Sequence, residues 1–367
     1  MPIVYAMQAL ILLKEAVIHL LNAPPMRKRQ FLQTAAAALL ACSALSSVQA
    51  QTTPLKFQLD WRFEGPAAFF VHPEQKGYFK EVGLDVNVEA ASGAGAIQRV
   101  ASGTHDLGFA DLAALMEFHA NNPDAPIKPV AVMVIYNTTP ASVMALKKSG
   151  ITKAADLTGK KMGAPIFDAG RRTFPLFAQA NGVGDVQWTT MDPPLRETML
   201  ARGELDAVTG YTFTSLLNLE ARGIKREDIV VLPYATHGVQ LYGNVIIASP
   251  KLIAEKPEAL RAFLKAFAKG TKEAIAQPEV AIASLKAKDG LVKTDLEIKR
   301  LKLTIETAVD SEGARKEGFG RLKPERLKLM AEQVAKAYET KNPIPVDAVW
   351  NGNFLPSAAE LDVLPKR

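Results

Sequence analysis

Cysteine is almost absent from this sequence. The chain of 367 residues contains one, Cys42, which lies in an apolar N-terminal segment that we expect to be removed. A mature chain without cysteine forms no disulfide and offers no thiolate as a nucleophile or metal ligand. The serine-hydrolase motif G-x-S-x-G and the zinc-helix motif H-E-x-x-H are missing as well. The sequence therefore predicts no catalytic residue, no metal site and no cofactor.

A large charge of one sign is also missing. The formal net charge is +6, from 44 Lys and Arg against 38 Asp and Glu. Residues 1–50 hold four of the bases and one of the acids, which leaves 40 bases against 37 acids in the rest of the chain. These bases are dispersed, whereas a nucleic-acid-binding surface needs them on one face. We therefore expect no nucleic-acid partner.

The N-terminal segment has the pattern of a leader. Arg27-Lys28-Arg29 precedes an apolar run over residues 34–45, which at 12 residues is too short to span a membrane. Val48-Gln49-Ala50 then fits the small-x-small pattern of a signal-peptide cleavage site. Residues 26–50 are thus predicted to be a signal peptide, which exports the protein to the periplasm, and residues 1–25 an upstream extension.

Two alternatives concern the same leader. The run Arg27-Lys28-Arg29 also resembles a twin-arginine export signal, although its adjacent pair is Lys-Arg. Leu39-Leu40-Ala41-Cys42 resembles a bacterial lipobox, which would make Cys42 a lipid-anchored N-terminus. The good cleavage site at Ala50 favours removal of Cys42 with the rest of the leader.

Strands and helices alternate along the rest of the chain. Residues 55–111 read as strand, helix, strand, helix and strand, and a second series of this kind follows over 160–222. Such alternation is typical of βαβ units on a mostly parallel sheet. Two β-rich stretches, 127–145 and 239–249, lead out of the first series and back to it, and no Gly/Ser-rich linker separates the series.

These patterns predict an α/β fold with two lobes, each a mostly parallel sheet flanked by helices. Residues 55–140 and 240–367 are expected to form lobe one, and residues 141–239 lobe two. Because the chain would pass between the lobes twice as extended strand, we expect the two crossings to act as a hinge.

The carboxyl ends of the strands are where such sheets bind their ligands. In lobe one these ends carry Trp61, whose ring can stack on a flat ligand, and Asp111. The turn Ser92-Gly93-Ala94-Gly95 precedes a helix, so its backbone N–H groups are candidates for binding an anion. The alternatives are a tryptophan of the core and a plain tight turn.

Lobe two offers a second set of candidates. Asp168 is expected to cap a helix that carries Arg171 and Arg172, and either guanidinium can pair with a carboxylate or sulfonate. The alternative is that both arginines are solvated. The remaining candidates lie at strand ends, turns or crossings, and they are Tyr211, Thr212, Glu64, Asn137 and Asn244.

Several segments carry a family resemblance: Leu59-Asp60-Trp61, KGYFKEVGLDV over 76–86, SGTHDLG over 102–108, ADLTGKKMG over 155–163, and NFLP over 353–356. In them the chain resembles the periplasmic substrate-binding proteins of ABC importers, in the group that serves nitrate, taurine and alkanesulfonates, and thiamine pyrimidine precursors. The resemblance covers almost all of residues 55–356. It implies a type II periplasmic binding fold, a small-molecule ligand trapped between two lobes, and ABC permease and ATPase subunits as partners of a monomeric binding protein.

The resemblance leaves the ligand open. Pyrimidine-precursor binders keep a carboxylate in lobe two after the strand that ends here at Gly210, but residues 211–214 contain no acid. With Arg171 and Arg172, this favours an organic anion such as a sulfonate or an aromatic carboxylate, and a pyrimidine-type compound remains the alternative. A thiamine-pyrimidine synthase of the same fold needs a cysteine-rich motif that is missing here, so we expect no enzyme. A ligand-sensing binding protein is a further alternative.

Overall fold

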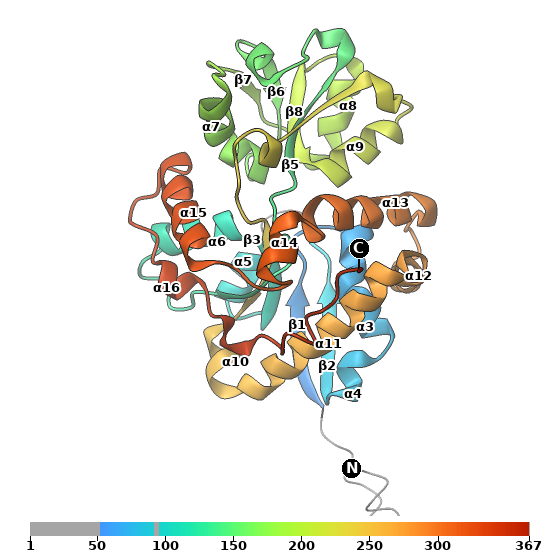
Figure 1. Cartoon of the computed structure of the whole chain (residues 1–367), viewed down its shortest axis with the longest axis vertical. Coiled ribbons are helices and arrows are strands. Elements are labelled where there is room, and N and C mark those ends of the chain that lie inside the picture. The colour runs from blue at the N-terminus through green and yellow to red at the C-terminus, as the bar shows by residue number, and fades with distance from the viewer. Residues whose placement is uncertain (1–51, 92–94, 367) are drawn as a thin grey trace, which may run out of the picture. The chain divides into compact units, whose positions relative to one another are not determined.

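The computed structural model describes residues 52–91 and 95–366, which form two five-stranded sheets flanked by helices (Figure 1). The predicted leader lies outside the described residues, as do Ser92, Gly93 and Ala94 of the predicted anion-binding turn. Among the described residues, no helix is both long and apolar enough to cross a lipid bilayer.

The first sheet has the strand order β2-β1-β3-β10-β4. Strand β1 pairs in parallel with β2 and β3, whereas β10 lies antiparallel between β3 and β4. Four strands therefore run in one direction and β10 runs against them. The bounds are β1 Thr53–Gln58, β2 Leu84–Glu89, β3 Leu107–Asp111, β4 Val130–Val134 and β10 Asn244–Ala248.

The second sheet repeats this plan, in the order β7-β6-β8-β5-β9. Strand β6 pairs in parallel with β7 and β8, and β5 lies antiparallel between β8 and β9. The bounds are β5 Ala141–Leu146, β6 Lys161–Gly163, β7 Gln187–Thr189, β8 Ala207–Tyr211 and β9 Ile229–Pro233.

The reversed strand in each sheet is the one that the chain enters after a crossing. Residues 135–140 connect β4 to β5, and residues 234–243 connect β9 to β10. Strand β4 ends at the first crossing, and the reversed strand β5 starts from it. In each sheet the four strands that run in one direction therefore have their carboxyl ends on the side of the crossings. This confirms the predicted α/β fold with mostly parallel sheets. We propose that the lobes divide within the two crossings, as the predicted boundaries at 140 and 239 have it.

Helices cover both faces of the first sheet. Along β10 the side chains alternate, with Ile246 in one apolar cluster and Val245 and Ile247 in the other, as a strand buried on both faces requires. The helices with this sheet, which we call lobe one, are α3 Ala68–Gln75, α4 Tyr78–Glu81, α5 Gly95–Ala101, α6 Leu112–Asn121, α10 Pro250–Glu255, α11 Pro257–Ala276, α12 Pro278–Lys288, α14 Glu312–Glu317, α15 Pro324–Ala337 and α16 Val346–Val349. Those of lobe two are α7 Ala169–Asn181, α8 Arg196–Arg202 and α9 Thr212–Glu220.

Aromatic packing fixes α3 and α11 on β1. The ring of Phe70 lies 4.7 Å from that of Phe57 and 5.0 Å from that of Phe267, centroid to centroid. A Cβ on Gly270 of α11 would lie 2.6 Å from Pro73 of α3, so glycine permits this close approach of the two helices. The packing makes a firm base for the end of β1, from which the first wall of the site continues.

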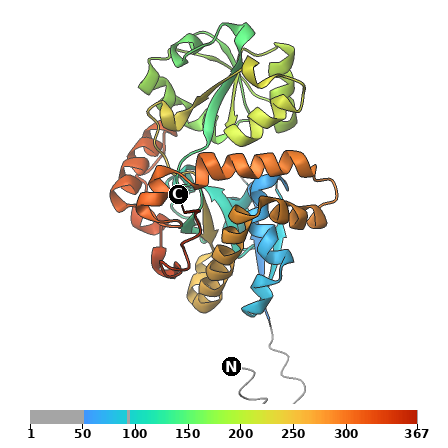
Figure 2. The ribbon, with the colours of Figure 1, turned by 45° about the vertical axis from the view of Figure 1, so that its right-hand side comes forward.

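One more helix, α13 (Thr294–Thr304), lies between the lobes in both views (Figure 1, Figure 2). It packs on the short 3-10 turn η1 (Gly65–Ala67) of lobe one and on α9 of lobe two. A Cβ on Gly65 would lie 2.6 Å from the carbonyl oxygen of Glu297, so the contact needs glycine at this position.

Candidate ligand-binding site

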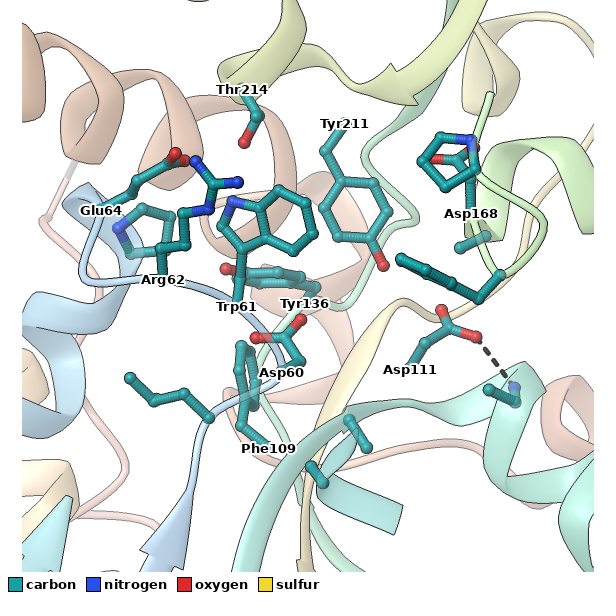
Figure 3. A pocket seen from close by; sticks show the side chains of 18 of the residues that line it. Asp60, Trp61, Arg62, Glu64, Phe109, Asp111, Tyr136, Asp168, Tyr211 and Thr214 are labelled. Carbon is teal, nitrogen blue, oxygen red and sulfur yellow. Dashed lines mark hydrogen bonds between the residues drawn. The ribbon is translucent and has the colours of Figure 1, made fainter. Parts of the chain in front are cut away.

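A cavity lies where the carboxyl ends of the two sheets face each other, and its walls come from both lobes (Figure 3). Its empty space is about 1080 Å³, counted to the open mouth. Sites for small molecules are mostly apolar with a few placed polar groups. Aromatic rings form much of the lining, and they belong to Trp61, Phe70, Phe109, Tyr136, Phe167, Tyr211, Phe213 and Tyr338.

Six of the residues predicted from the sequence line this cavity: Trp61, Glu64, Asp111, Asp168, Arg172 and Tyr211. They come from strand ends and helix starts of both sheets, which is where the alternation of strands and helices places a ligand. Gly95 begins α5, and the next residue, Ala96, contributes to the lining.

Trp61 and Glu64 follow β1 and form the lobe-one side of the cavity. The indole Nε1 of Trp61 is buried, and its contact with the Glu64 carboxyl lowers the pKa of that group. The carboxylate of Glu64 lies 3.6 Å from the guanidinium of Arg300 on α13. Burial raises the pKa of Glu64, and the charge of Arg300 opposes that rise.

Two further carboxyl groups of lobe one face the cavity. Asp60 Oδ2 accepts a 2.6 Å hydrogen bond from Asn244 Nδ2, and burial raises the pKa of Asp60 to about 7. Asp111 caps α6, because its Oδ1 accepts from the backbone N–H of Ala114 at 2.9 Å (Figure 3). Burial raises the pKa of Asp111 too, against the cap bond and the charge of Arg172. A hydrogen bond with Tyr211 also lowers the pKa of Asp111, and in their ionised forms both acids can accept further hydrogen bonds from a ligand.

Two arginines that line the cavity, Arg172 and Arg196, already form ion pairs with acidic side chains. Arg172 forms an ion pair with Glu117 of α6 and lies 4.1 Å over the ring of Tyr338. Arg196, at the start of α8, is 4% exposed. Its guanidinium contacts Asp168 Oδ2 at 3.0 Å and Glu197 Oε1 at 2.8 Å.

Asp168 caps α7 as predicted, since its Oδ1 accepts from the backbone N–H of Arg171 at 2.9 Å. The same oxygen accepts from Thr209 Oγ1 at 2.7 Å. A Cβ on Gly210 would lie 2.9 Å from Arg196 Cζ, so glycine leaves room for the guanidinium under the end of β8. The carboxylate of Asp168 thus holds lobe two together at the cavity wall.

Besides Gly95, four predicted residues lie outside the cavity lining. Arg171 donates to Ala164 O and Thr190 Oγ1 and stacks on Trp188. The other three are held by polar partners near the crossings: Thr212 contacts Ser142 Oγ at 2.5 Å, Asn137 binds Glu317 and Arg326, and Asn244 lies between Asp60 and Tyr211. A position at a strand end indicates the edge of the sheet but leaves the direction of the side chain open.

The sequence interpretation missed several lining residues. Asp60 and Arg62 flank the predicted Trp61, and Tyr136 precedes the predicted Asn137, so proximity to a strand end was a usable signal for them. Arg196 and Tyr338 carried no such signal. Tyr338 follows α15, more than 120 residues after Arg196 in the chain, and only folding brings it to the cavity.

Replacement of Asp60 by asparagine is expected to change how stability depends on pH. Burial raises the pKa of Asp60 to about 7 in the folded protein, whereas the pKa of an unfolded aspartate keeps its ordinary value of 3.8. The folded state therefore binds more protons between these values, and the free energy of unfolding falls as the pH rises through this window. Asp60→Asn should remove this decline. The melting temperature of the variant, relative to that of the parent, should therefore rise between pH 4.5 and pH 8. Parallel melting curves over this range would contradict the expectation.

A comparison with known proteins gives the family. Residues 67–281 match the family model described as NMT1/THI5 like. The chain is 25% identical over 210 residues to the riboflavin-binding protein RibY of Chloroflexus aurantiacus, a match covering 56% of this chain and 58% of that protein. It is 28% identical over 257 residues to the formylaminopyrimidine-binding protein of Halalkalibacterium halodurans, covering 66% and 75%. It is 27% identical over 241 residues to the 4-amino-5-hydroxymethyl-2-methylpyrimidine phosphate synthase THI13 of Saccharomyces cerevisiae, covering 62% and 68%.

Solved structures show the same fold. The periplasmic aliphatic sulphonate-binding protein SsuA of Escherichia coli matches with a TM-score of 0.64 at 16% identity, over 83% of this chain and 94% of that one. The periplasmic nitrate-binding protein NrtA of Synechocystis PCC 6803 matches with a TM-score of 0.60 at 13% identity, over 86% and 90%. The likeness at these identities concerns the fold, that of periplasmic binding proteins.

Proposed function

The chain belongs to the NMT1/THI5-like family, and from this premise we propose that it is a non-catalytic solute-binding protein of an ABC importer. It captures a flat, nitrogen-containing aromatic compound of the pyrimidine type between its lobes and delivers it to a membrane permease with its ATPase. The observation that carries this proposal is the cavity itself. It has aromatic walls, and the acceptor groups Asp60 and Asp111 face it from lobe one.

The charges of the cavity favour a ligand with N–H donors over a simple anion. Asp60 and Asp111 have no ion pair within 4 Å among the described residues, so in their ionised forms their carboxyl oxygens are acceptors for such donors. Arg172 and Arg196 are each paired with an acid, and an anion would have to displace that acid. Flat aromatic ligands also suit the rings of Trp61 and its neighbours, because offset stacking adds to their apolar burial.

The names of the relatives support the same class. Riboflavin, formylaminopyrimidine and the aminopyrimidine of the synthase are all nitrogen heteroaromatic compounds. The lining residues include no histidine, cysteine or lysine among the described part of the chain, which supports binding over synthesis. We infer a monomer that the signal peptide over residues 26–50 exports to the periplasm. A sensor that presents the ligand to a receptor would use the same cavity.

An organic anion, such as a sulfonate or an aromatic carboxylate, is the second candidate. Arg62 favours it, because this exposed arginine lines the cavity next to Trp61 and makes no ion pair within 4 Å in the described residues. A single exposed guanidinium gives an anion one contact, whereas Asp60 and Asp111 of the same cavity are acidic. The pyrimidine-type ligand therefore fits more of the cavity.

A thermal-shift screen tests the proposal. The compounds are 4-amino-5-hydroxymethyl-2-methylpyrimidine, riboflavin, taurine, benzoate and nitrate, each added to the purified mature chain. At a concentration of 100 times Kd, a ligand stabilises the folded state by about 2.7 kcal/mol. We expect the pyrimidine to raise the melting temperature and to be recovered unchanged by mass spectrometry. Conversion of the pyrimidine would contradict a binding role, and a response confined to taurine or benzoate would establish the anion instead.

Replacement of Trp61 by alanine is expected to weaken binding of the responding compound about tenfold to a hundredfold. Loss of one stacking ring under a flat base costs about 1–3 kcal/mol. Isothermal titration calorimetry gives the affinity. Trp188→Ala is the matched control, because Trp188 lies in β7 of lobe two and is absent from the lining residues. Equal affinities of the Trp61 variant and the parent would remove this ring from the site.

A further inference from the structure

Asn244 lies behind the cavity wall and joins the two lobes. It is the first residue of β10, and its side chain is 0% exposed. Its Nδ2 donates to Asp60 Oδ2 at 2.6 Å, and its Oδ1 accepts from Tyr211 Oη at 2.8 Å. Asp60 follows β1 of lobe one and Tyr211 ends β8 of lobe two, and both line the cavity. Asn244 therefore contacts the site only through these two residues.

The backbone around Asn244 leaves little freedom for another arrangement. Its carbonyl oxygen accepts from the N–H groups of Ile135 and Tyr136, both at 3.0 Å, at the start of the first crossing. Within the sheet it is paired with Asp111 of β3. The backbone of Asn244 is thus held in place by both crossings and by the end of β3.

An amide has one donating end and one accepting end, so its orientation fixes the roles of its neighbours. Tyr211 donates to Asn244 Oδ1 at 2.8 Å, and a hydrogen-bond contact with Tyr211 lowers the pKa of Asp111, so the hydroxyl proton is engaged by these acceptors and the oxygen keeps a lone pair for a ligand. Asp60 receives the amide donor on one oxygen, and above about pH 7, where it is ionised, it keeps the other oxygen as an acceptor. Figure 3 shows the hydroxyl of Tyr211 directed toward the carboxylate of Asp111, a third acceptor at the same wall.

From these contacts we infer that Asn244 is a specificity-determining positioning residue: it makes one wall of the cavity an edge of acceptors, which selects ligands with N–H donors on the facing edge. The inference rests on the proposed function and deepens it. Burial and the negative charges of Asp111 and Asp60 raise the pKa of Tyr211, so the hydroxyl keeps its proton and stays in this role. A ligand donor in contact with Asp60 and Tyr211 also bridges the lobes that Asn244 connects.

Two probes of equal shape test the inference. One is 4-amino-5-hydroxymethyl-2-methylpyrimidine, and the other is its 4-methyl analogue, in which a methyl group of the same size replaces the amino donor. At pH 8, where Asp60 is ionised, the parent should bind the amino probe at least about tenfold more tightly, because the analogue leaves the acceptors of the wall without a donor. In Asn244→Leu, Tyr211 is released to donate its proton into the cavity, and the preference should fall to about threefold or less.

The ratio of the two affinities is the readout, since a general loss of structure weakens both probes alike. Tyr211→Phe keeps the ring and removes the hydroxyl, so it provides a second test if Asn244→Leu folds poorly, and the ratio should fall there too. Thr212→Val is the matched control, because Thr212 is buried beside the crossing and bonded to Ser142 and Pro140 without lining the cavity. Its ratio should equal that of the parent.

The outcomes separate this inference from the proposed function. An unchanged ratio in Asn244→Leu or, if that variant is unfolded, in Tyr211→Phe would overturn the role of Asn244 and leave the pyrimidine-binding function standing. A parent that binds neither probe but responds to taurine or benzoate would overturn the proposed ligand class, and the acceptor edge with it. Loss of the preference in both variants, with the control unchanged, would support the inference.

Discussion

Replacement of Arg300 by methionine should lower the free energy of unfolding by about 3–5 kcal/mol, the usual effect of removing one partner from a buried ion pair. Arg300 is 1% exposed and lies on α13. Its Nε donates to Glu297 Oε2 at 2.9 Å, and its Nη1 donates to the carbonyl oxygens of Phe213 and Thr214 at 2.8 and 3.1 Å. Without the guanidinium, a carboxylate and two carbonyl groups between the lobes lose their donor.

The contacts of Arg300 also explain why the effect reaches the cavity. Phe213 and Thr214 line it from lobe two, and Glu64 lines it from lobe one, 3.6 Å from Arg300 Nε. Glu297 binds the backbone N–H of Gly65 at 2.5 Å, so the same cluster holds the turn that follows Glu64. Loss of Arg300 should therefore weaken both the fold and the contact between the lobes.

Thermal and urea denaturation of the ligand-free protein measure this effect, which should lower the melting temperature by roughly 10 °C. Lys302→Met is the matched control on the same helix. Lys302 pairs with Glu279 where both side chains are more than half exposed, and such pairs contribute about 0–1 kcal/mol. Glu297→Gln added to Arg300→Met should recover part of the loss, because it removes the unpaired charge. A loss below about 1 kcal/mol for Arg300→Met would contradict the buried-pair interpretation.

Replacement of Arg196 by methionine is the second large effect, again with an expected loss of about 3–5 kcal/mol. Arg196 neutralises Glu197, whose side chain is 1% exposed, and Asp168 at the N-terminus of α7. Its removal leaves the carboxylates of Asp168 and Glu197 without this positively charged partner. Burial favours a proton on Glu197, whereas the charge of Arg196 lowers the pKa of that group, so the pKa of Glu197 should rise in the variant.

The pH dependence distinguishes this variant from a simple packing defect. The depressed pKa of Glu197 contributes stability above its unfolded pKa, and this stability is lost as the pH falls through the lower folded pKa. In Arg196→Met that contribution is missing, so the deficit relative to the parent should be largest at pH 7–8 and shrink toward pH 4. Arg202→Met is the control on the same helix, since its side chain is 70% exposed and its pair with Glu204 is long, at 3.8 Å. A deficit that is constant with pH would contradict the role of the charge.

The two arginines have a common consequence for the ligand. Arg196 and Arg300 lie close to the cavity, yet their positive charges are matched by Asp168, Glu197 and Glu297. The polarity of the cavity lining is therefore set by Asp60 and Asp111 together with the aromatic rings. Two guanidinium groups near a ligand site do not by themselves indicate an anion.

The sequence determined the architecture, because architecture follows from short-range patterns. The alternation of strands and helices gave the α/β class, and the two β-rich stretches around residues 137 and 241 gave the crossings. These crossings fix the direction of every strand, so they also place Trp61, Asp111 and Asp168 at facing edges of the two sheets. The cap at Asp168 was predictable for the same reason, since it needs only the residues next to it.

The tertiary structure decided what each of these edges presents to a ligand. Arg171 and Arg172 are neighbours in the sequence, but a helix places adjacent side chains about 100° apart. One guanidinium therefore lies on Trp188, and the other reaches the cavity and pairs with Glu117. The contact between Asp60 and Asn244 joins positions 184 residues apart, and no local pattern encodes such a pairing. Charge compensation and hydrogen-bond direction arise from contacts between distant segments, so only the folded chain shows whether the cavity offers acceptors or cations.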